Sequence, residues 1–167
     1  MKIDVIIPVY RPGKEFCELL ERLSHQTLPV NRILLMNTRT EVDVEALAAP
    51  FPGAEVVNLE QADFDHGGTR DWGAGLSDGD YLLFLTQDAL PADAYLVEHL
   101  AAAFRDPTVK AAYARQLPAK DCRTIERYTR AFNYPDKPMV KTKKNLETMG
   151  IKTYFASNVC CEYRKDI

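Results

Sequence analysis

The sequence predicts an α/β fold, with a mostly parallel central sheet that carries helices on both faces. Strand and helix patterns alternate along the chain, which is typical of parallel strands connected by helices. The stretch over residues 81–89 is an apolar run that stops on the lone carboxylate of Asp88, as expected for a buried strand of such a sheet. At 167 residues, the chain is long enough for one domain with a sizeable core.

The N-terminal elements follow from composition and spacing. A β-branched run predicts a strand over residues 3–9, and a turn that contains Pro12 and Gly13 ends it. Apolar residues at helical spacing predict a helix that starts near Phe16 and stops before Pro29. Short strands are expected over residues 32–36 and 54–59, and between them a weak helix over residues 41–49 stops at Pro50.

The remaining elements continue the alternation as far as Leu117. Gly67 and Gly68 open a helix that reaches Leu76, and a turn leads into the strand at residue 81. A helix around residues 96–104 precedes a strand over residues 109–114. Beyond Leu117 the pattern changes. We expect a helix over residues 122–132, a polar and mobile segment over 141–150, and one strand or two short ones over 154–163.

Composition excludes several classes of protein. The net charge of −3 argues against a nucleic-acid-binding surface, and the small basic cluster of Lys141, Lys143 and Lys144 is interpreted as a solvated face without a partner. The first strand leaves no room for a signal peptide, and no apolar stretch approaches the roughly 20 residues of a membrane span. A cytoplasmic protein is expected, for which attachment to the inner face of the plasma membrane stays open. The four cysteines lack metal-ligand spacing and are expected to be reduced thiols: Cys17, Cys122, Cys160 and Cys161.

Three loops are expected at the edge of the sheet where the parallel strands end. Ligands of open α/β sheets bind at this edge. The loops cover residues 8–13, 37–40 and 86–89. Tyr10 offers a ring for stacking, Asn37 an amide for hydrogen bonds, and Asp88 a carboxylate for a hard cation or a polar ligand.

A second group of polar residues lies at the start of the helix predicted after residue 66. Asp65 is either the N-cap of this helix or a site residue, and both interpretations stay open. Gly67 and Gly68 would let backbone amides approach a ligand, and Arg70 is placed to clamp a phosphate through two hydrogen bonds. His66 is either a contact to a sugar or phosphate, or a structural histidine.

Taken together, these groups resemble a known family. The segments Ile6-Ile7-Pro8-Val9-Tyr10, Phe64-Asp65-His66-Gly67-Gly68-Thr69-Arg70 and Thr86-Gln87-Asp88-Ala89 are similar, in this order, to motifs of family 2 glycosyltransferases, and among these to the bacterial rhamnosyltransferase-like enzymes. The resemblance extends from residue 3 to about residue 163. It implies the GT-A fold, a Rossmann-like α/β sheet, which is expected to be incomplete at the C-terminus of this chain.

The resemblance also implies an activity. Family members transfer a sugar with inversion from a nucleoside diphosphate sugar to a hydroxyl of a polysaccharide or lipid-linked acceptor, and they usually need Mg²⁺ or Mn²⁺. A deoxysugar such as rhamnose is the donor sugar expected here. The family's general base lies further along the chain than Ile167. No catalytic residue is therefore assigned, and residues 1–167 are expected to bind a donor yet turn over poorly.

Site residues follow by position from the family motifs. The first loop is expected to pack on the nucleoside, and Asn37 stands where an acidic residue usually reads the base. The metal motif D-x-D is matched by Thr86-Gln87-Asp88, so Asp88 is the one predicted metal ligand. A literal D-x-D at Asp63-Phe64-Asp65 is interpreted as a decoy, because a helix follows it. The predicted donor-binding residues are Pro8, Val9, Tyr10, Arg11, Asn37, His66, Gly67, Arg70, Gln87 and Asp88.

Residues 1–117 are expected to form a nucleotide-sugar-binding half, and residues 118–167 the start of an acceptor-side half. Two alternatives stay open. One is a non-catalytic nucleotide-sugar-binding domain with a degenerate or truncated site, which Thr86 in place of the first carboxylate favours. The other is a sugar nucleotidyltransferase, which would carry a glycine-rich loop directly after the first strand, where this chain has residues 8–13.

Overall fold

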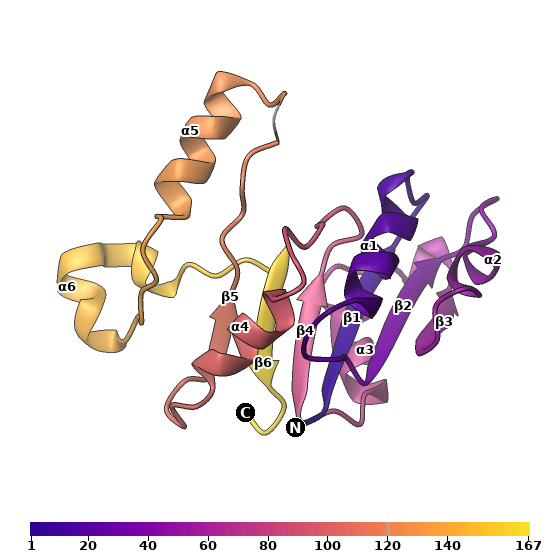
Figure 1. The fold of residues 1–167 in the computed structure, drawn as a ribbon, viewed down its shortest axis with the longest axis horizontal. Helices are drawn as coiled ribbons and strands as arrows, with labels where there is room; N and C mark the ends of the chain where they lie inside the picture. Colours follow the sequence, from indigo (N-terminus) through magenta and orange to yellow (C-terminus); the bar gives the residue numbers. More distant parts are fainter. Residues whose placement is uncertain (120) are drawn as a thin grey trace. The chain divides into compact units, whose positions relative to one another are not determined.

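A computed structural model describes residues 1–119 and 121–167 and contains a six-stranded sheet in the order β3-β2-β1-β4-β6-β5 (Figure 1). The strands are β1 Ile3–Val9, β2 Arg32–Thr38, β3 Ala54–Leu59, β4 Tyr81–Leu85, β5 Ala111–Tyr113 and β6 Cys160–Arg164. The α-helices are α1 Glu15–Ser24, α2 Val44–Ala48, α3 Gly68–Leu76, α4 Leu96–Ala103, α5 Thr124–Asn133 and α6 Leu146–Met149. Short 3-10 helices are η1 Gln61–Asp63, η2 Lys143–Asn145 and η3 Gly150–Tyr154.

The sheet is mixed, with one reversed strand. Strands β3, β2, β1 and β4 are parallel, whereas β6 runs antiparallel to both of its neighbours, β4 and β5. Helices α1 and α4 lie on one face of the sheet and α3 lies on the other (Figure 1). The predicted α/β fold with a mostly parallel sheet is confirmed. Because β1, β2 and β4 are parallel, their carboxyl ends lie at one edge.

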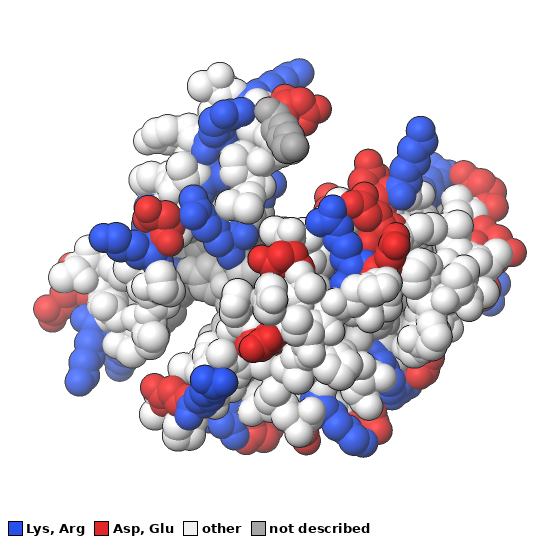
Figure 2. Space-filling view, viewed as in Figure 1, with Lys and Arg blue, Asp and Glu red and all other residues white. Residues whose placement is uncertain are grey.

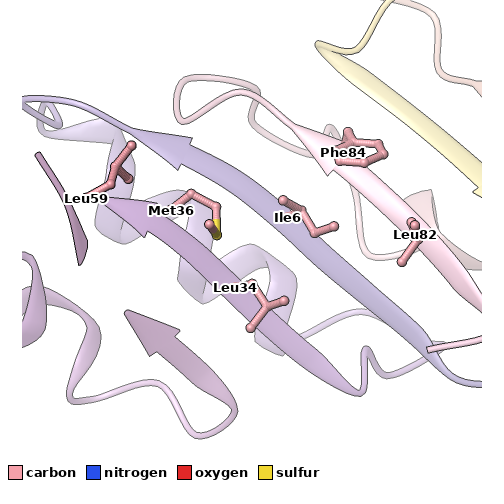
Figure 3. Close-up of a cluster of buried hydrophobic side chains, with 6 residues drawn as sticks. All are labelled: Ile6, Leu34, Met36, Leu59, Leu82 and Phe84. Atoms are coloured by element: carbon pink, nitrogen blue, oxygen red, sulfur yellow. The ribbon is translucent and has the colours of Figure 1, made fainter. Parts of the chain in front are cut away.

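An apolar cluster closes the face of the sheet beneath α3 (Figure 3). Its buried members come from β1, β2, β3 and β4: Ile6, Leu34, Met36, Leu59, Leu82 and Phe84. Gly73 allows α3 to approach this cluster closely. A Cβ atom at Gly73 would lie 2.7 Å from Cγ2 of Ile6 and 3.3 Å from Sδ of Met36. A larger residue therefore could not occupy this position without displacing α3, whose N-terminus carries the second group of predicted site residues.

Helix α1 is amphipathic, as its spacing predicts. Its buried residues are Phe16, Leu19, Leu20 and Leu23. In β1 and β2 nearly every residue is buried, so these strands are covered on both sides. Such strands have the near-continuous apolar sequences that predicted them.

A buried carboxylate organises the edge opposite the predicted site. Asp4 is fully buried at the start of β1. It accepts hydrogen bonds from Oγ of Ser77 (2.6 Å), from Nδ2 of Asn31 (2.7 Å) and from the backbone N–H groups of Asp78 and Gly79 (3.2 Å each). The turn before β4 is thereby fixed to β1, because a buried carboxylate needs several donors to offset its desolvation.

Several element boundaries differ from the predicted ones. Strand β2 continues through Thr38, because Asn37 and Thr38 pair with Asn58 and Leu59 of β3. Strand β5 begins only at Ala111. For residues 154–163, where one strand or two short ones are predicted, the structure has the end of η3 followed by one strand, β6, that begins at Cys160. The segment over residues 141–150 contains η2 and α6.

The chain divides into two compact units. Unit 1 comprises Met1–Tyr113 and Asn158–Ile167 and holds the whole sheet, and unit 2 comprises Ala114–Ser157. Because β6 pairs with β4, the last residues belong to unit 1, whereas the prediction divides the chain once, at residue 117. The four cysteines, all of them among the described residues, form no disulfide. None of the helices in the described ranges has the length and apolar character that a membrane crossing needs.

Candidate functional site

The predicted donor-binding residues all lie in unit 1, most of them at or just after the ends of β1, β2 and β4, and His66, Gly67 and Arg70 at the start of α3. Val9 pairs with Asn37 across β1 and β2, so the first loop starts beside Asn37. Val9 as a whole is 1% exposed and belongs to the core, whereas Tyr10 is 40% exposed. Val9 therefore offers a ligand almost no surface in this conformation, while Tyr10 is available.

Gln87 joins the loop after β4 to the loop after β1. The backbone N–H of Tyr10 donates to Oε1 of Gln87 (2.8 Å), and Nε2 of Gln87 donates to the carbonyl of Tyr10 (2.9 Å). Both polar atoms of the Gln87 amide are thus engaged by one backbone residue. Gln87 is therefore placed to hold Tyr10 in position. The side-chain amide of Gln87 could contact a sugar donor directly, as predicted, only if these two hydrogen bonds opened.

Arg11 has a backbone conformation that is unusual for a residue with a side chain. Its φ of +44° lies in the left-handed region, which costs a non-glycine residue about 1 kcal/mol. The guanidinium carbon lies 5.4 Å from the ring centroid of Tyr10, and Nε lies 3.6 Å from Oε1 of Glu41. Both charged side chains of this pair are well exposed, so the pair is worth little in stability. The strained loop after β1 therefore presents a ring and a cation side by side.

Asn37 is a buried residue of β2 rather than part of a loop. Its Nδ2 donates to Oδ1 of Asn58 (2.7 Å), and Nδ2 of Asn58 donates to Oε1 of Glu45 (2.5 Å). The hydrogen bond from Asn58 holds the pKa of Glu45 below its usual range. Oδ1 of Asn37 and Oγ1 of Thr38 are buried and accept no hydrogen bond from the described residues. Asn37 therefore keeps one unused acceptor beside the first loop.

Asp65 lies two residues before Gly67, the N-cap of α3, and binds backbone amides at the start of that helix. Its Oδ1 accepts hydrogen bonds from the backbone N–H groups of Gly68 (2.5 Å) and Gly67 (3.0 Å), which hold the pKa of Asp65 below its usual range. A Cβ atom at Gly68 would lie 3.1 Å from this oxygen, so the glycine permits the close approach. The structure supports a structural role for Asp65 at the start of α3, although the N-cap residue itself is Gly67. The two glycine amides expected to meet a ligand are engaged by its carboxylate.

Arg70 lies one turn inside α3 and is half-buried. Nη1 donates to the carbonyl of His66 (2.6 Å), and Nε is buried and finds no acceptor among the described residues. Burial lowers the pKa of Arg70, but a guanidinium stays charged at neutral pH. His66 is exposed, with its ring edge-on to Phe64 at 5.0 Å. The hydrogen bond of Arg70 and the ring contact of His66 both stay within residues 64–70.

Asp88 lies exposed in the turn that follows β4. The turn is fixed by two backbone hydrogen bonds, from Ala89 N–H to the carbonyl of Thr86 and from Thr86 N–H to the carbonyl of Val159, both of 3.1 Å. Among the described residues, no three His, Cys, Asp or Glu side chains gather as a metal centre would require. The donor set is thus a single carboxylate, which suits a cation that also takes oxygens from a bound diphosphate and from water.

One carboxylate in the sheet has no visible partner. Glu162 of β6 is fully buried between Leu83 of β4 and Ala112 of β5, and neither of its oxygens accepts a hydrogen bond from the described residues. Desolvation raises the pKa of Glu162 to about 8. Sequence reasoning gives this acid no role. The signal that could have identified its burial is its position inside the strand pattern Cys160–Tyr163.

Comparison with known proteins identifies the relatives of this chain. The family model described as glycosyl transferase family 2 matches residues 4–167. The chain is 36% identical over 168 residues to the O-antigen chain rhamnosyltransferase RfbN of Salmonella typhimurium, covering all of this chain and 54% of that protein. It is 29% identical to the O-antigen chain rhamnosyltransferase WbaN of Salmonella anatum, covering 98% and 52%. The chain thus spans about half the length of these curated relatives.

Solved structures share the fold at low sequence identity. S. aureus TarS 1-349 in complex with UDP-GlcNAc has a TM-score of 0.69 at 16% identity, covering 99% of this chain and 46% of that one. The mannosyltransferase PcManGT of Pyrobaculum calidifontis, in complex with GDP-Man and Mn²⁺, has a TM-score of 0.61 at 18% identity, covering 69% of this chain and 36% of that one. Glycosyltransferase structures therefore share the α/β sheet described above.

Proposed function

This chain belongs to glycosyl transferase family 2, and we propose that it binds the donor in a transfer of rhamnose from a nucleoside diphosphate sugar to a hydroxyl of a polysaccharide or lipid-linked acceptor. The observation that carries the proposal is the paired hydrogen bonding of Gln87 with Tyr10. It fixes the exposed ring of Tyr10 beside the turn of Asp88, at the edge where ligands of α/β sheets bind. The rhamnosyltransferase relatives support the choice of sugar.

The nucleoside would lie against the first loop. The ring of Tyr10 would stack on the base, with the half-buried Pro8 beneath it, the cation of Arg11 beside it and the buried Val9 supporting the loop from the core. The unused Oδ1 of Asn37 is an acceptor for an N–H of the base once the loop adjusts to the ligand. Ring stacking tolerates different bases, so Asn37 would supply the selectivity.

The diphosphate would lie between Asp88 and the start of α3. Mg²⁺ or Mn²⁺ fits the exposed carboxylate of Asp88, because such ions are commonly held by one carboxylate together with substrate phosphates and water. When bound, the ion would neutralise the charge that develops on the diphosphate as the sugar leaves. Arg70 would turn its guanidinium toward the same oxygens, since its Nε already lacks an acceptor in the described structure. His66 would contact the sugar or a phosphate.

Inversion requires a base on the face of the sugar opposite the diphosphate. Asp65 is engaged by backbone amides at the start of α3 and Glu162 is buried in the sheet, so neither is assigned this role. We propose that the base belongs to a part of the protein other than residues 1–167, and that transfer takes place in the cytoplasm at the inner face of the plasma membrane, where a lipid-linked acceptor is accessible.

A second candidate is a non-catalytic domain that binds a nucleotide sugar. The observation that favours it is Thr86, which stands where the D-x-D motif has its first carboxylate and whose Oγ1 is buried without a partner among the described residues. Both candidates predict donor binding, but only the first predicts turnover when the chain is extended to the length of its relatives.

The two candidates are separated by two measurements. A thermal-shift screen of UDP, GDP and dTDP, each with and without Mn²⁺, should show stabilisation of residues 1–167 by at least one nucleotide, and more with the metal. Transfer from the matching nucleoside diphosphate rhamnose to a lipid-linked acceptor should then appear in the extended protein. Binding without transfer in the extended protein would support the non-catalytic domain, and absence of nucleotide binding would contradict both candidates.

A further inference from the structure

Helix α5 of unit 2 carries an apolar stripe that faces solvent. Ile125, Tyr128 and Phe132 are 81%, 70% and 56% exposed, and no residue of α5 is buried. Their spacing of three and four residues places them on one face of the helix. The rings of Tyr128 and Phe132 are stacked with centroids 6.2 Å apart, so the stripe is continuous along the helix.

The opposite side of α5 is charged. Glu126, Arg127 and Arg130 project there by helical spacing, and Arg130 pairs with Glu126 at 3.6 Å. The helix therefore combines a strongly apolar face with a charged face at low overall hydrophobicity. This combination is typical of helices that lie in the plane of a membrane surface.

Four further apolar residues of unit 2, which follow α5 in the sequence, are exposed. Met139, Val140, Ile151 and Tyr154 are between 55% and 83% exposed. Lys152 places Nζ 3.1 Å from the ring centroid of Phe132, so a cation lies directly against the stripe. A lysine in this position can keep its ammonium in the headgroup layer while its stem lies along apolar surface.

Unit 2 is also basic, in contrast to the rest of the chain. Residues 114–157 contain ten Lys and Arg against four Asp and Glu, a net charge of +6, whereas the remaining residues contain eleven against twenty, a net charge of −9. Figure 2 shows Lys and Arg side chains spread over the part of the molecule that carries α5 and α6. The basic cluster of Lys141, Lys143 and Lys144, interpreted from sequence as a solvated face, belongs to this unit.

We propose that the stripe of Ile125, Tyr128 and Phe132, with the basic residues around it, docks unit 2 onto a bilayer surface that contains anionic phospholipid. Charge complementarity selects this occupant. A second copy that docked through the same stripe would bring two units of +6 together, and a nucleic acid would use the charges but leave the apolar stripe in water. The biological role of this docking rests on the proposed function, because docking would hold the donor site near a lipid-linked acceptor. The docking itself needs no donor.

Flotation of residues 1–167 with vesicles tests the proposal. Binding is expected to vesicles of roughly 70% phosphatidylcholine and 30% phosphatidylglycerol at low salt, and to be about tenfold or more weaker for phosphatidylcholine alone. Replacing Ile125 and Phe132 together by serine should weaken binding to the mixed vesicles about tenfold. Both side chains are exposed, so folding should be unaffected. The matched control is Leu76→Ser, which removes an apolar side chain 41% exposed in α3.

A charge series completes the test. Lys143→Glu with Lys144→Glu should weaken binding to the mixed vesicles, whereas Arg105→Glu with Lys110→Glu, the same charge change in unit 1, should leave most of it. Equal binding to both vesicle types, or no loss in the serine variant, would overturn the proposal. So would a dimer in light scattering that the serine variant dissociates, because the stripe would then be a contact between copies. Nucleotide binding, measured on the same variants by thermal shift, reports separately on the proposed function.

Discussion

Gln87 and Tyr10 are 77 residues apart in sequence and hold each other by two hydrogen bonds, one in each direction between the side-chain amide of Gln87 and the backbone of Tyr10. The pair connects the loops that follow β1 and β4. An aromatic ring and the turn of the proposed metal ligand are thereby fixed relative to each other before any ligand binds. Such preorganisation lowers the cost of ordering loops on binding.

Replacing Gln87 by glutamate should weaken nucleotide binding without unfolding the protein. Glutamate keeps the acceptor for the N–H of Tyr10, but it puts an oxygen in place of the N–H group that donates to the carbonyl of Tyr10. One hydrogen bond is therefore lost, which is worth about 1 kcal/mol. Calorimetry should show that the affinity for the nucleotide falls by up to about fivefold. The unfolding temperature should stay close to that of the wild type. Gln61→Glu in the exposed helix η1 is the control. An unchanged affinity in Gln87→Glu would show that the pairing does not organise the donor site.

Gly73→Ala should destabilise the protein by about 1–3 kcal/mol, because the new methyl group would overlap Ile6 and Met36 and push α3 from the sheet. Gly75 lies in the same helix, and a methyl group added there would have no heavy atom within 4 Å outside its immediate surroundings in the helix. Gly75→Ala should instead stabilise the helix by about 0.5–1 kcal/mol. Urea unfolding of the two variants should give opposite signs. Equal effects would mean that α3 does not pack as closely as described.

The buried carboxyl of Glu162 should make stability depend on pH. Its pKa is about 8 in the folded protein against an ordinary value of 4.5. Between these values the folded state keeps a proton that the unfolded state releases. The contribution of Glu162 to the free energy of unfolding should thus be largest below pH 4.5. Between pH 4.5 and pH 8 this contribution should fall by up to about 1.4 kcal/mol per pH unit.

Glu162→Gln removes the titrating group, so its free energy of unfolding should change little between about pH 5 and pH 8, and it should exceed that of the wild type at the upper end of this range. The control Glu147→Gln lies on the exposed helix α6 and should retain the wild-type pH dependence. Urea unfolding at several pH values measures both. A wild-type curve that is flat over this range would contradict the burial of an unpartnered Glu162.

Asp65→Ala should destabilise the start of α3, since it removes the acceptor of two backbone N–H groups. Without this acceptor both N–H groups lose their protein partner, so the free energy of unfolding should fall. Because the pKa of Asp65 is lower in the folded protein than its ordinary value, the ionised carboxylate stabilises the fold at pH values above that ordinary value. This stabilisation should be lost as the pH falls. Urea unfolding at neutral pH measures the effect, with Asp63→Ala as control. If Asp63→Ala were the more destabilising variant, the structural role at the start of α3 would be assigned to the wrong residue.

The strands of unit 1 could be predicted from sequence because buried parallel strands are nearly all apolar. The same rule misplaces Asn37 and Thr38 in a loop: they are polar, and only their pairing with β3 shows that the strand continues. The reversed β6 begins at Cys160 after irregular chain, and neither its direction nor its start follows from residue periodicity.

The positions of the loops in the candidate site could be predicted from sequence, but the hydrogen bonds within the site could not. The sequence indicated which loops meet at the edge of the sheet. It could not indicate that the amide of Gln87 bonds the backbone of Tyr10, or that the amides of Gly67 and Gly68 bond Asp65, because bonds between side chains and backbone leave no periodic pattern. The exposed stripe of α5 is likewise ambiguous in sequence, since an amphipathic helix usually buries its apolar face.

Metal-dependent nucleotide binding by Asp88 is the most direct test of the account. The nucleoside diphosphate found in the thermal-shift screen would be titrated by calorimetry into the wild type, Asp88→Asn and the control Asp63→Asn, each with and without Mn²⁺. Mn²⁺ should strengthen binding to the wild type and to Asp63→Asn by about tenfold or more in affinity, and Asp88→Asn should lose this gain. Equal gains in all three proteins would contradict the assignment of Asp88 as the metal ligand of a donor site.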